Sequence, residues 1–341
     1  MLFPAHRPGL VLAPMQDITD LPFMRTVAAF GAPDLFVTEY FRVHIHSRPD
    51  PYLLRSITEN ETGKPILAQM IGRDTAELVR TAKTLQNFPV AGIDLNLGCP
   101  APVVCRKDAG GGLLRDPEKV NELLDALRNA CPEKKFTVKT RLGYDQPEEF
   151  LALLEIFQKH SIDALTIHGR TVKERYQTPI HPDYIRLAAD SLSCPVVANG
   201  NVVNVQSGLT LLQLTGADGL MVGRGAIRHP WLFRQLASAL EGQPTPIIPC
   251  REVWHYLQML FDETARERTD FIEEKHVQKM KKYLVFIVQG HPPELEFRMR
   301  RVRTQADLFA LFRDFLDHDD PVPDLPPETS RLFCGFSELL T

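Results

Sequence analysis

The chain has 341 residues, of which 44% are hydrophobic and 24% are charged, proportions that are ordinary for a globular protein. Its net charge of −4 excludes a protein that is basic throughout. No apolar run reaches the roughly 18 residues of a membrane span, and the first residues lack the apolar stretch of a secretory signal, so we expect a cytoplasmic protein. The six cysteines include no C-x-x-C pair, which argues against a disulfide framework or a metal site.

Short apolar, β-branched runs recur along the first two thirds of the chain and alternate with stretches of helical periodicity, such as Thr75–Leu85, Pro117–Ala130 and Glu148–His160. This alternation indicates a parallel sheet, and eight units over about 240 residues match the size of a closed (β/α)8 TIM barrel. An open doubly wound sheet is the alternative. The predicted strands are Leu10–Pro14, Leu35–Glu39, Ile66–Met70, Ile93–Asn96, Thr137–Arg141, Leu165–His168, Val196–Asn199 and Leu220–Val222.

Polar residues or glycines stand at the carboxyl end of almost every predicted strand. In a (β/α)8 barrel the active site is built at this end, and burying such groups without partners costs a few kcal/mol each. The residues concerned are Met15-Gln16, Thr38-Glu39, Gln69, Asn96-Leu97-Gly98-Cys99, Lys139, Arg141, His168-Gly169-Arg170, Asn199-Gly200-Asn201 and Gly223-Arg224.

The pattern changes after a Pro/Gly-rich stretch at residues 241–246. Helical patterns follow at Arg251–Arg268, Ile272–Gln289 and Pro293–Asp317, without strand signals. We therefore divide the chain into a barrel domain, residues 1–243, and an all-α helical domain, residues 244–341, that includes an acidic, proline-rich tail. The segment from Lys275 to Arg303 contains eight Lys/Arg and only two Glu, which predicts a local contact with a polyanion. A solvated helix face is the alternative.

Six short motifs occur in one order along the chain. Together they resemble the bacterial tRNA-dihydrouridine synthase family, and the segments 38–43 and 169–176 are most similar to its subfamily C, which modifies position 16 of the tRNA D-loop. The resemblance implies NADPH-dependent reduction of a uridine in tRNA by FMN, held in a TIM barrel with a C-terminal helical domain. We expect a monomer that binds tRNA and neither metal nor membrane. The motifs are Ala13-Pro14-Met15, Asn96-Leu97-Gly98-Cys99-Pro100, Val138-Lys139-Thr140-Arg141-Leu142-Gly143, Ile167-His168-Gly169-Arg170-Thr171, Ala198-Asn199-Gly200 and Val222-Gly223-Arg224-Gly225.

The resemblance assigns Cys99 as the catalytic residue. Reduction of the C5=C6 bond of uracil needs a hydride at C6 and a proton at C5, and a thiol on the face opposite the flavin can donate that proton as a general acid. A lone cysteine is otherwise a small buried apolar residue. The following Ala109-Gly110-Gly111-Gly112 lacks the Lys-Ser/Thr of a phosphate loop, so we interpret it as a mobile flap carrying Cys99.

The expected cofactor residues lie on several strands. Lys139 would stabilise the anionic reduced flavin, although pairing with a buried acid such as Asp94 is the alternative, and Gln69 suits the edge of the flavin ring. The phosphate would lie at the loops after strands seven and eight, near a helix N-terminus. The complete predicted set is Pro14, Met15, Gln16, Gln69, Lys139, His168, Asn199, Gly200, Asn201, Gly223 and Arg224.

A uridine in folded tRNA has to be flipped out to reach such a pocket. Asn96, Arg141 and Arg170 are predicted to bind the uracil carbonyls and the backbone phosphate, and Glu39 to fix a ribose or a neighbouring side chain. On the helices, the phosphate backbone would be bound by Lys279, Lys281 and Arg301. Two other functions stay open: an FMN-dependent small-molecule dehydrogenase of the dihydroorotate type, and a non-catalytic tRNA-binding protein.

Overall fold

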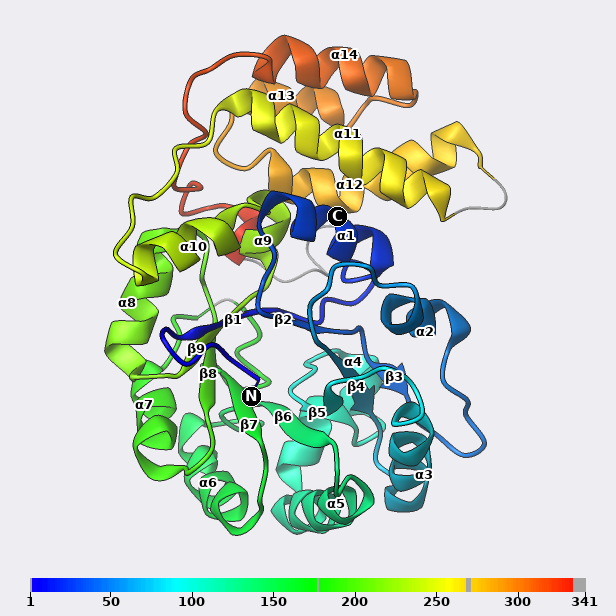
Figure 1. Ribbon diagram of the computed structural model, residues 1–341, viewed down its shortest axis with the longest axis vertical. Helices are drawn as coiled ribbons and strands as arrows, with labels where there is room; N and C mark the ends of the chain where they lie inside the picture. The colour runs from blue at the N-terminus through cyan, green and yellow to red at the C-terminus, as the bar shows by residue number, and fades with distance from the viewer. Residues whose placement is uncertain (1, 177, 268–270, 334–341) are drawn as a thin grey trace.

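The computed structural model describes residues 2–176, 178–267 and 271–333. Within these residues one parallel sheet closes on itself, because β1 pairs with both β2 and β9 while β2 also pairs with β4. All eight predicted strands are present, and the expected (β/α)8 barrel is confirmed (Figure 1). The strands are β1 Gly9–Leu12, β2 Leu35–Val37, β3 Phe41–Arg42, β4 Ile66–Ile71, β5 Gly92–Leu97, β6 Lys135–Arg141, β7 Ala164–His168, β8 Val196–Asn199 and β9 Gly219–Val222.

Strand β3 was not predicted from the sequence. It continues the line of β2, since β2 pairs with the first residues of β4 and β3 pairs with the last two. The pairing is interrupted at residues 38–40, where the Thr38 hydroxyl accepts a hydrogen bond from the Gln69 backbone N–H at 3.1 Å. A side-chain oxygen thus replaces a backbone carbonyl, and the strand ends two residues earlier than predicted.

Helices surround the barrel and follow from local signals. An aspartate precedes each of α1, α2, α3 and α5, and its carboxylate accepts an N–H of the first turn. The helices predicted at 75–85 and 117–130 have those bounds, whereas the one predicted at 148–160 is split into η2 and α6. The elements are α1 Leu21–Gly31, α2 Pro51–Thr58, α3 Thr75–Leu85, α4 Pro102–Cys105, η1 Gly110–Arg115, α5 Pro117–Ala130, η2 Pro147–Glu149, α6 Phe150–Lys159, α7 Pro182–Ser191, α8 Val205–Thr215, α9 Arg224–Arg228 and α10 Leu232–Leu240.

The remaining helices are α11 Cys250–Arg266, α12 Glu273–Ile287, α13 Pro293–Met299, α14 Gln305–Leu316 and the short η3 Arg331–Phe333. The prediction of one helix over Pro293–Asp317 is wrong, because α13 and α14 are separate. The Thr304 hydroxyl accepts the backbone N–H of Asp307 at 3.1 Å and so begins α14 anew. None of the described helices is long and apolar enough to cross a membrane.

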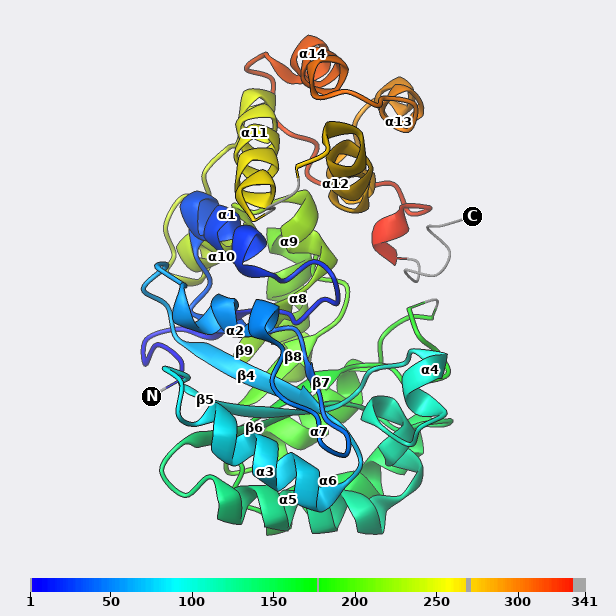
Figure 2. The same cartoon turned by 90° about the vertical axis from the view of Figure 1, so that its right-hand side faces the viewer.

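The C-terminal helices, α11 to α14, lie on one side of the barrel (Figures 1 and 2). Helix α11 packs against α1, and α12 packs against α9. Tyr283 of α12 stacks on Phe23 of α1 with ring centroids 5.7 Å apart, and the Tyr256 hydroxyl donates to the Ile227 carbonyl at 2.9 Å. The buried apolar side chains of both parts form one continuous cluster.

The acidic, proline-rich tail runs back to the barrel. We call residues 321–333 the return segment. The fully buried Arg228 donates to the carbonyls of Pro323 at 2.5 Å, Asp324 at 3.2 Å and Gln289 at 2.7 Å. The Asn204 side chain donates to the Asp324 carboxylate at 2.6 Å. The return segment therefore joins the end of α12 to the loops after β8 and β9; residues 334–341 of the predicted tail lie outside the described residues.

Candidate active site

The site residues predicted in the barrel meet at the carboxyl ends of the strands, the side on which α4 lies in Figure 2. The register of the sheet makes several of them direct neighbours on adjacent strands. Asn96 of β5 is opposite Lys139 of β6, and His168 of β7 is opposite both Arg141 of β6 and Asn199 of β8. Residues spread over a hundred positions in the sequence are thereby brought to one end of the barrel.

Cys99 lies half-buried in the turn after β5. The Asn96 side-chain oxygen accepts the backbone N–H groups of Gly98 at 3.0 Å and of Cys99 at 2.9 Å, which fixes this turn. The Cys99 carbonyl accepts the N–H of Gly111 at 3.1 Å, and a Cβ on that glycine would lie 2.9 Å from the same carbonyl. The glycine run is therefore buried against Cys99 in η1, where close approach requires glycine.

A buried chain of hydrogen bonds connects this turn to the barrel interior. The Asn96 amide donates to the Gln69 side-chain oxygen at 2.8 Å, and the Gln69 amide donates to Asp94 at 2.7 Å. Thr137 donates to the other Asp94 oxygen at 2.6 Å, and burial raises the pKa of Asp94 to about 6. Gln69 retains one N–H for a further partner, because only one of its two amide hydrogens is used.

The Lys139 ammonium has no hydrogen bond or ion pair to any residue in the described parts of the chain. The alternative pairing with Asp94 is not formed as a direct ion pair: the Asp94 oxygens accept hydrogen bonds from Gln69 and Thr137, and Asp94 acts on Lys139 only through its charge. Burial and the nearby Arg141 lower the pKa of Lys139 to about 8, which still leaves it mainly cationic at neutral pH. An unpaired, half-buried cation is costly, so its presence points to an anionic ligand.

Arg141 connects the turn of Cys99 to the loop after β7. It is 1% exposed and donates to the carbonyls of Gly98 at 3.0 Å, Thr171 at 2.7 Å and Arg175 at 2.8 Å. This geometry suits a role in holding both loops in place. Its predicted contact with uracil stays a prediction.

Arg170 is also buried. Its guanidinium donates to the Thr178 carbonyl at 2.6 Å and to the Asn201 side chain at 3.2 Å, and it lies 3.3 Å from the His168 ring nitrogen Nε2. Burial, with further cations nearby, lowers the pKa of Arg170 to about 10. Arg170 thus ties the loop after β7 to the loop after β8, and its predicted contact with tRNA also stays a prediction.

Positive charge gathers around His168. Burial holds the pKa of this imidazole well below its usual value, and the surrounding cations act in the same direction. The Tyr176 ring lies among these groups, with its centroid 4.4 Å from the guanidinium of Arg224, 5.2 Å from that of Arg141 and 5.6 Å from the His168 ring. Such a cluster favours a bound anion. The cations around His168 are Arg141, Lys139, Arg170 and Arg224.

The loops after β8 and β9, where the phosphate is predicted to bind, have closely packed backbones. Gly200 and Asn201 adopt positive φ angles of 139° and 53°, and the Asn199 amide donates to the carbonyl of Met221 at 2.8 Å. A Cβ on Gly225 would lie 2.2 Å from the carbonyl of Val202, so this position requires glycine.

The loop after β1 lies beside these two loops. The Met15 sulfur would be 3.6 Å from a Cβ on Gly223, and Met15 is buried. Pro14 is half-buried, whereas Gln16 is exposed and donates to the Asp17 carboxylate at 3.3 Å. The three predicted residues of this loop therefore border the β9 loop, with Gln16 outermost.

Comparison with known proteins agrees with this geometry. A family model described as dihydrouridine synthase (Dus) matches residues 11–316. The chain belongs to the dihydrouridine synthase family. Similar relatives include a tRNA-dihydrouridine(16) synthase of Neisseria meningitidis serogroup A, 30% identical over 89% of this chain and 92% of that protein, and the tRNA-dihydrouridine synthase B of Yersinia pestis, 34% identical over 85% and 89%. Since relatives of both kinds are about equally similar, the comparison does not distinguish the expected subfamily C.

A solved structure, the old yellow enzyme homologue from Zymomonas mobilis, has a TM-score of 0.50 with 14% sequence identity, covering 72% of this chain and 94% of that one. At this identity the likeness shows the fold alone, which is the barrel. No cluster of His, Cys, Asp or Glu among the described residues could hold a metal ion.

Sequence reasoning missed Tyr40 in this dihydrouridine synthase. Tyr40 stands between β2 and β3 and is 8% exposed. Burial and then its interaction with Cys99 raise the pKa of Tyr40 to about 12, so the phenol stays protonated next to the thiol. The pairing could not be predicted from the sequence, because the two residues lie on loops 59 positions apart.

Glu39 and a second missed residue, Lys282, lie at the edge of the same site. The buried Glu39 carboxylate accepts the Asp17 backbone N–H at 2.8 Å, and burial raises the pKa of Glu39 to about 7. Lys282 of α12 donates to the Asp17 carbonyl. The only sequence signal for Lys282 was its membership of the basic run.

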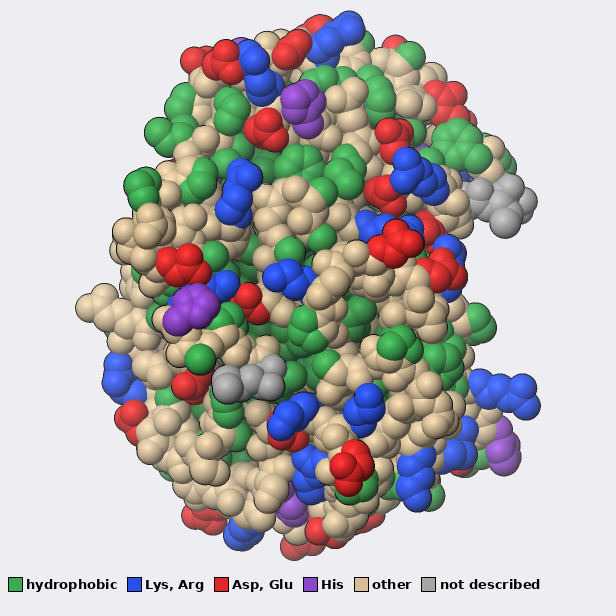
Figure 3. Space-filling view, in the orientation of Figure 1, with side chains coloured by type: hydrophobic (Ala, Val, Ile, Leu, Met, Phe, Trp, Pro, Cys, Tyr) green, Lys and Arg blue, Asp and Glu red, His purple; other side chains and the backbone are tan. Residues whose placement is uncertain are grey.

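The three predicted phosphate contacts on the helices do not share one face. Lys281 donates to the Arg300 carbonyl at 2.8 Å, beside α13, whereas Lys279 is roughly 200° away around the axis of α12, toward the side of Lys282. Arg301 is exposed and lies 3.6 Å above the Phe297 ring. On the face seen in Figure 3, Lys and Arg are interspersed with Asp and Glu, so basic side chains do not gather there.

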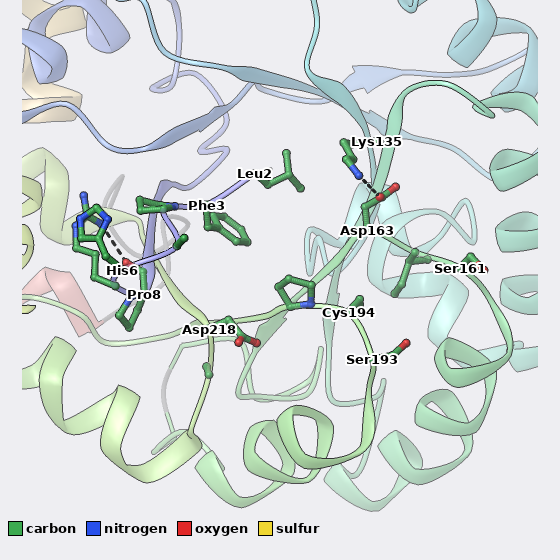
Figure 4. A pocket seen from close by; sticks show the side chains of 16 residues that line it. Leu2, Phe3, His6, Pro8, Lys135, Ser161, Asp163, Ser193, Cys194 and Asp218 are labelled. Carbon is green, nitrogen blue, oxygen red and sulfur yellow. Dashed lines mark hydrogen bonds and ion pairs between the residues drawn. The ribbon is translucent and has the colours of Figure 1, made fainter.

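A cavity of about 820 Å³ lies at the other end of the barrel, where residues 2–8 form part of its lining (Figure 4). Its charged groups already have partners: Lys135 lies 2.7 Å from Asp163, and Arg7 lies 2.7 Å from Asp34. Because the strands point away from this end, the cavity is no part of the candidate active site.

Proposed function

We propose that the protein reduces a uridine of tRNA to dihydrouridine, with FMN as bound cofactor and NADPH as reductant, in the cytoplasm and as a monomer. The observation that carries this proposal is the unpaired Lys139 cation beside Cys99, at the carboxyl end of a barrel whose family reduces uridine. FMN, when bound, would supply the hydride for C6 of the uracil ring.

The described residues fit FMN. Lys139 offers a cation without a partner for an anionic reduced flavin, and Gln69 offers a free N–H for the ring edge. Gly200 and Gly225 let the loops after β8 and β9 pack closely together, and Arg224, next to Gly225 in the chain, can neutralise a phosphate. We propose the same role for the neighbouring Pro14, Met15, Gln16, His168, Asn199, Asn201 and Gly223.

Cys99 would donate the proton to C5. Backbone contacts with Asn96 and Gly111 fix the position of Cys99, and the Tyr40 side chain lies next to its sulfur. Tyr40, protonated at neutral pH, lies next to the sulfur and can donate a hydrogen bond to the thiolate that remains after proton transfer, and water would then reprotonate Cys99.

For the substrate we propose a D-loop uridine, with position 16 favoured by the segments 38–43 and 169–176 that resemble subfamily C. Asn96, Arg141, Arg170 and Glu39 would border the flipped base, and Lys279, Lys281 and Arg301 would contact the phosphate backbone.

Reconstitution tests the proposal. Purified protein loaded with FMN is incubated with NADPH and unmodified tRNA, and dihydrouridine is measured position by position in the product. We expect dihydrouridine in the D-loop and none without NADPH. Oxidation of dihydroorotate without any tRNA product would favour the small-molecule dehydrogenase, and tRNA binding by a protein that takes up no flavin would favour a non-catalytic role.

A further inference from the structure

Asp17 stands in the loop after β1 with a left-handed backbone. Its φ angle is 60°, in a region that favours glycine and that aspartate adopts less readily than an extended or right-handed conformation. Both of its backbone polar groups are held by charged side chains: the N–H by the Glu39 carboxylate at 2.8 Å, and the carbonyl by the Lys282 ammonium. The left-handed conformation is thus stabilised from two sides.

Lys282 reaches this loop from α12, 265 positions along the chain. Its ammonium lies 4.8 Å from the ring centroid of Tyr283 and is partly buried between α12 and the barrel. Burial lowers the pKa of Lys282, while Asp20, Glu39 and Asp17 oppose that shift and Lys279 adds to it. No carboxylate of the described residues lies within ion-pair distance of Lys282. Among these residues, its hydrogen bond is to the backbone carbonyl of Asp17.

We propose that Lys282 is a positioning residue of the flavin pocket. By binding the Asp17 carbonyl, this residue of α12 fixes the conformation of the loop after β1, including the adjoining Met15 and Gln16. This inference rests on the proposed function, in which that loop borders FMN. It deepens that function, because a residue of the helices that would bind tRNA also determines the geometry of the cofactor site.

The same helix provides a matched control. Lys275 lies seven positions earlier, on the same side of α12, and is exposed. Lys275→Met and Lys282→Met remove the same charge from the same helix face. Only the second removes the contact with Asp17.

The test uses the FMN-loaded full chain. We measure the FMN dissociation constant, the visible circular dichroism of bound flavin and the thermal midpoint of both variants. Lys282→Met is expected to bind FMN about tenfold more weakly and to change the flavin dichroism, whereas Lys275→Met should match the wild type. Lys282→Arg, which keeps a cationic donor, should restore most of the affinity. A Lys282→Met protein with a lowered thermal midpoint but unchanged FMN affinity and dichroism would overturn the proposal.

Testing Lys282→Met in a second variant, Asp17→Gly, distinguishes an effect that acts through the Asp17 backbone from a direct effect of the Lys282 charge. Glycine adopts the left-handed conformation without support, so in Asp17→Gly the further weakening caused by Lys282→Met should fall well below tenfold. Equal weakening in both backgrounds would show that Lys282 does not act through Asp17. If the wild type itself binds no FMN, the proposed function fails; if it binds FMN and Lys282→Met is indistinguishable from it, this inference alone fails.

Discussion

At the scale of single residues, the turn around Cys99 is held by the backbone of Cys99 and not by its thiol, which lies next to Tyr40. Asn96 binds its N–H, and Gly111 binds its carbonyl. Removing the thiol therefore leaves the surrounding turn intact, which makes Cys99 suitable for substitution.

We expect Cys99→Ala to keep FMN and to accept electrons from NADPH, because no contact described above uses the sulfur of Cys99 to hold the cofactor loops. Dihydrouridine formation should fall by roughly 10²–10⁴-fold, the usual contribution of a general acid. Single-turnover assays with pre-reduced enzyme measure this step separately. Turnover near the wild-type rate would mean that another group, such as Tyr40, protonates C5.

Lys139→Met should make the flavin harder to reduce, because it removes the cation expected to stabilise the reduced anion. Loss of about 1.4 kcal/mol would lower the two-electron midpoint potential by about 30 mV. Since burial lowers the pKa of Lys139 to about 8, the wild-type cation is lost as pH rises through that value, and the potentials of wild type and Lys139→Met should converge there. Redox titration from pH 6 to 9 checks both effects.

Lys135→Met is the control for this titration, because Lys135 is exposed on the same strand and paired with Asp163. Its potential should equal that of the wild type at each pH. An unchanged potential and FMN occupancy in Lys139→Met would show that Lys139 does not act on the flavin.

At the scale of elements, strands and helices followed from periodicity, whereas their interruptions did not. The end of β2 depends on the hydroxyl of Thr38, and the break before α14 depends on that of Thr304. Each is one side chain that competes with a backbone hydrogen bond, which an apolar pattern does not reveal. The positions of site residues at strand ends were predictable for the same reason that the strands were, whereas Tyr40, Tyr176 and Lys282 enter from loops and a distant helix.

The arrangement of α12 and α13 leads to a test of the basic segment. If these helices bind the tRNA backbone, Lys279→Ala, Lys281→Ala and Arg301→Ala together should weaken tRNA binding and reduce its salt dependence. Abolishing one phosphate contact reduces the slope of log K against log salt by roughly 0.7–0.9. FMN content should not change, because the flavin site lies in the barrel.

The matched control removes three lysines of the barrel periphery, Lys64, Lys83 and Lys159. It changes the net charge equally and should retain the wild-type slope. Because Lys279 and Lys281 face different sides of α12, the single variants will also show which side binds RNA. If the triple variant keeps the wild-type slope, the basic segment is a solvated helix face.

At the scale of the whole molecule, Arg228 joins three parts of the chain: α9, the end of α12 and the return segment. Arg228→Met would leave three carbonyls without this donor, and each buried unsatisfied group costs about 1–3 kcal/mol. We expect the free energy of unfolding to fall by about 3 kcal/mol in urea titrations. Arg313→Met, on the exposed side of α14, should change it little. A decrease below about 1 kcal/mol for Arg228→Met would show that the return segment is held by other interactions.

The continuous apolar cluster has a consequence for how this chain can be recombined. The sequence pattern changes near residue 243, but the side chains of α11 and α12 complete the packing of α1 and α9. A cut at that position would expose the apolar surfaces of Phe23 and Ile227 to water, and grafted helices from a relative would have to match them in shape. The two parts are therefore not interchangeable modules, and an exchange of helices between relatives requires the contact surface of the barrel to be exchanged along with them.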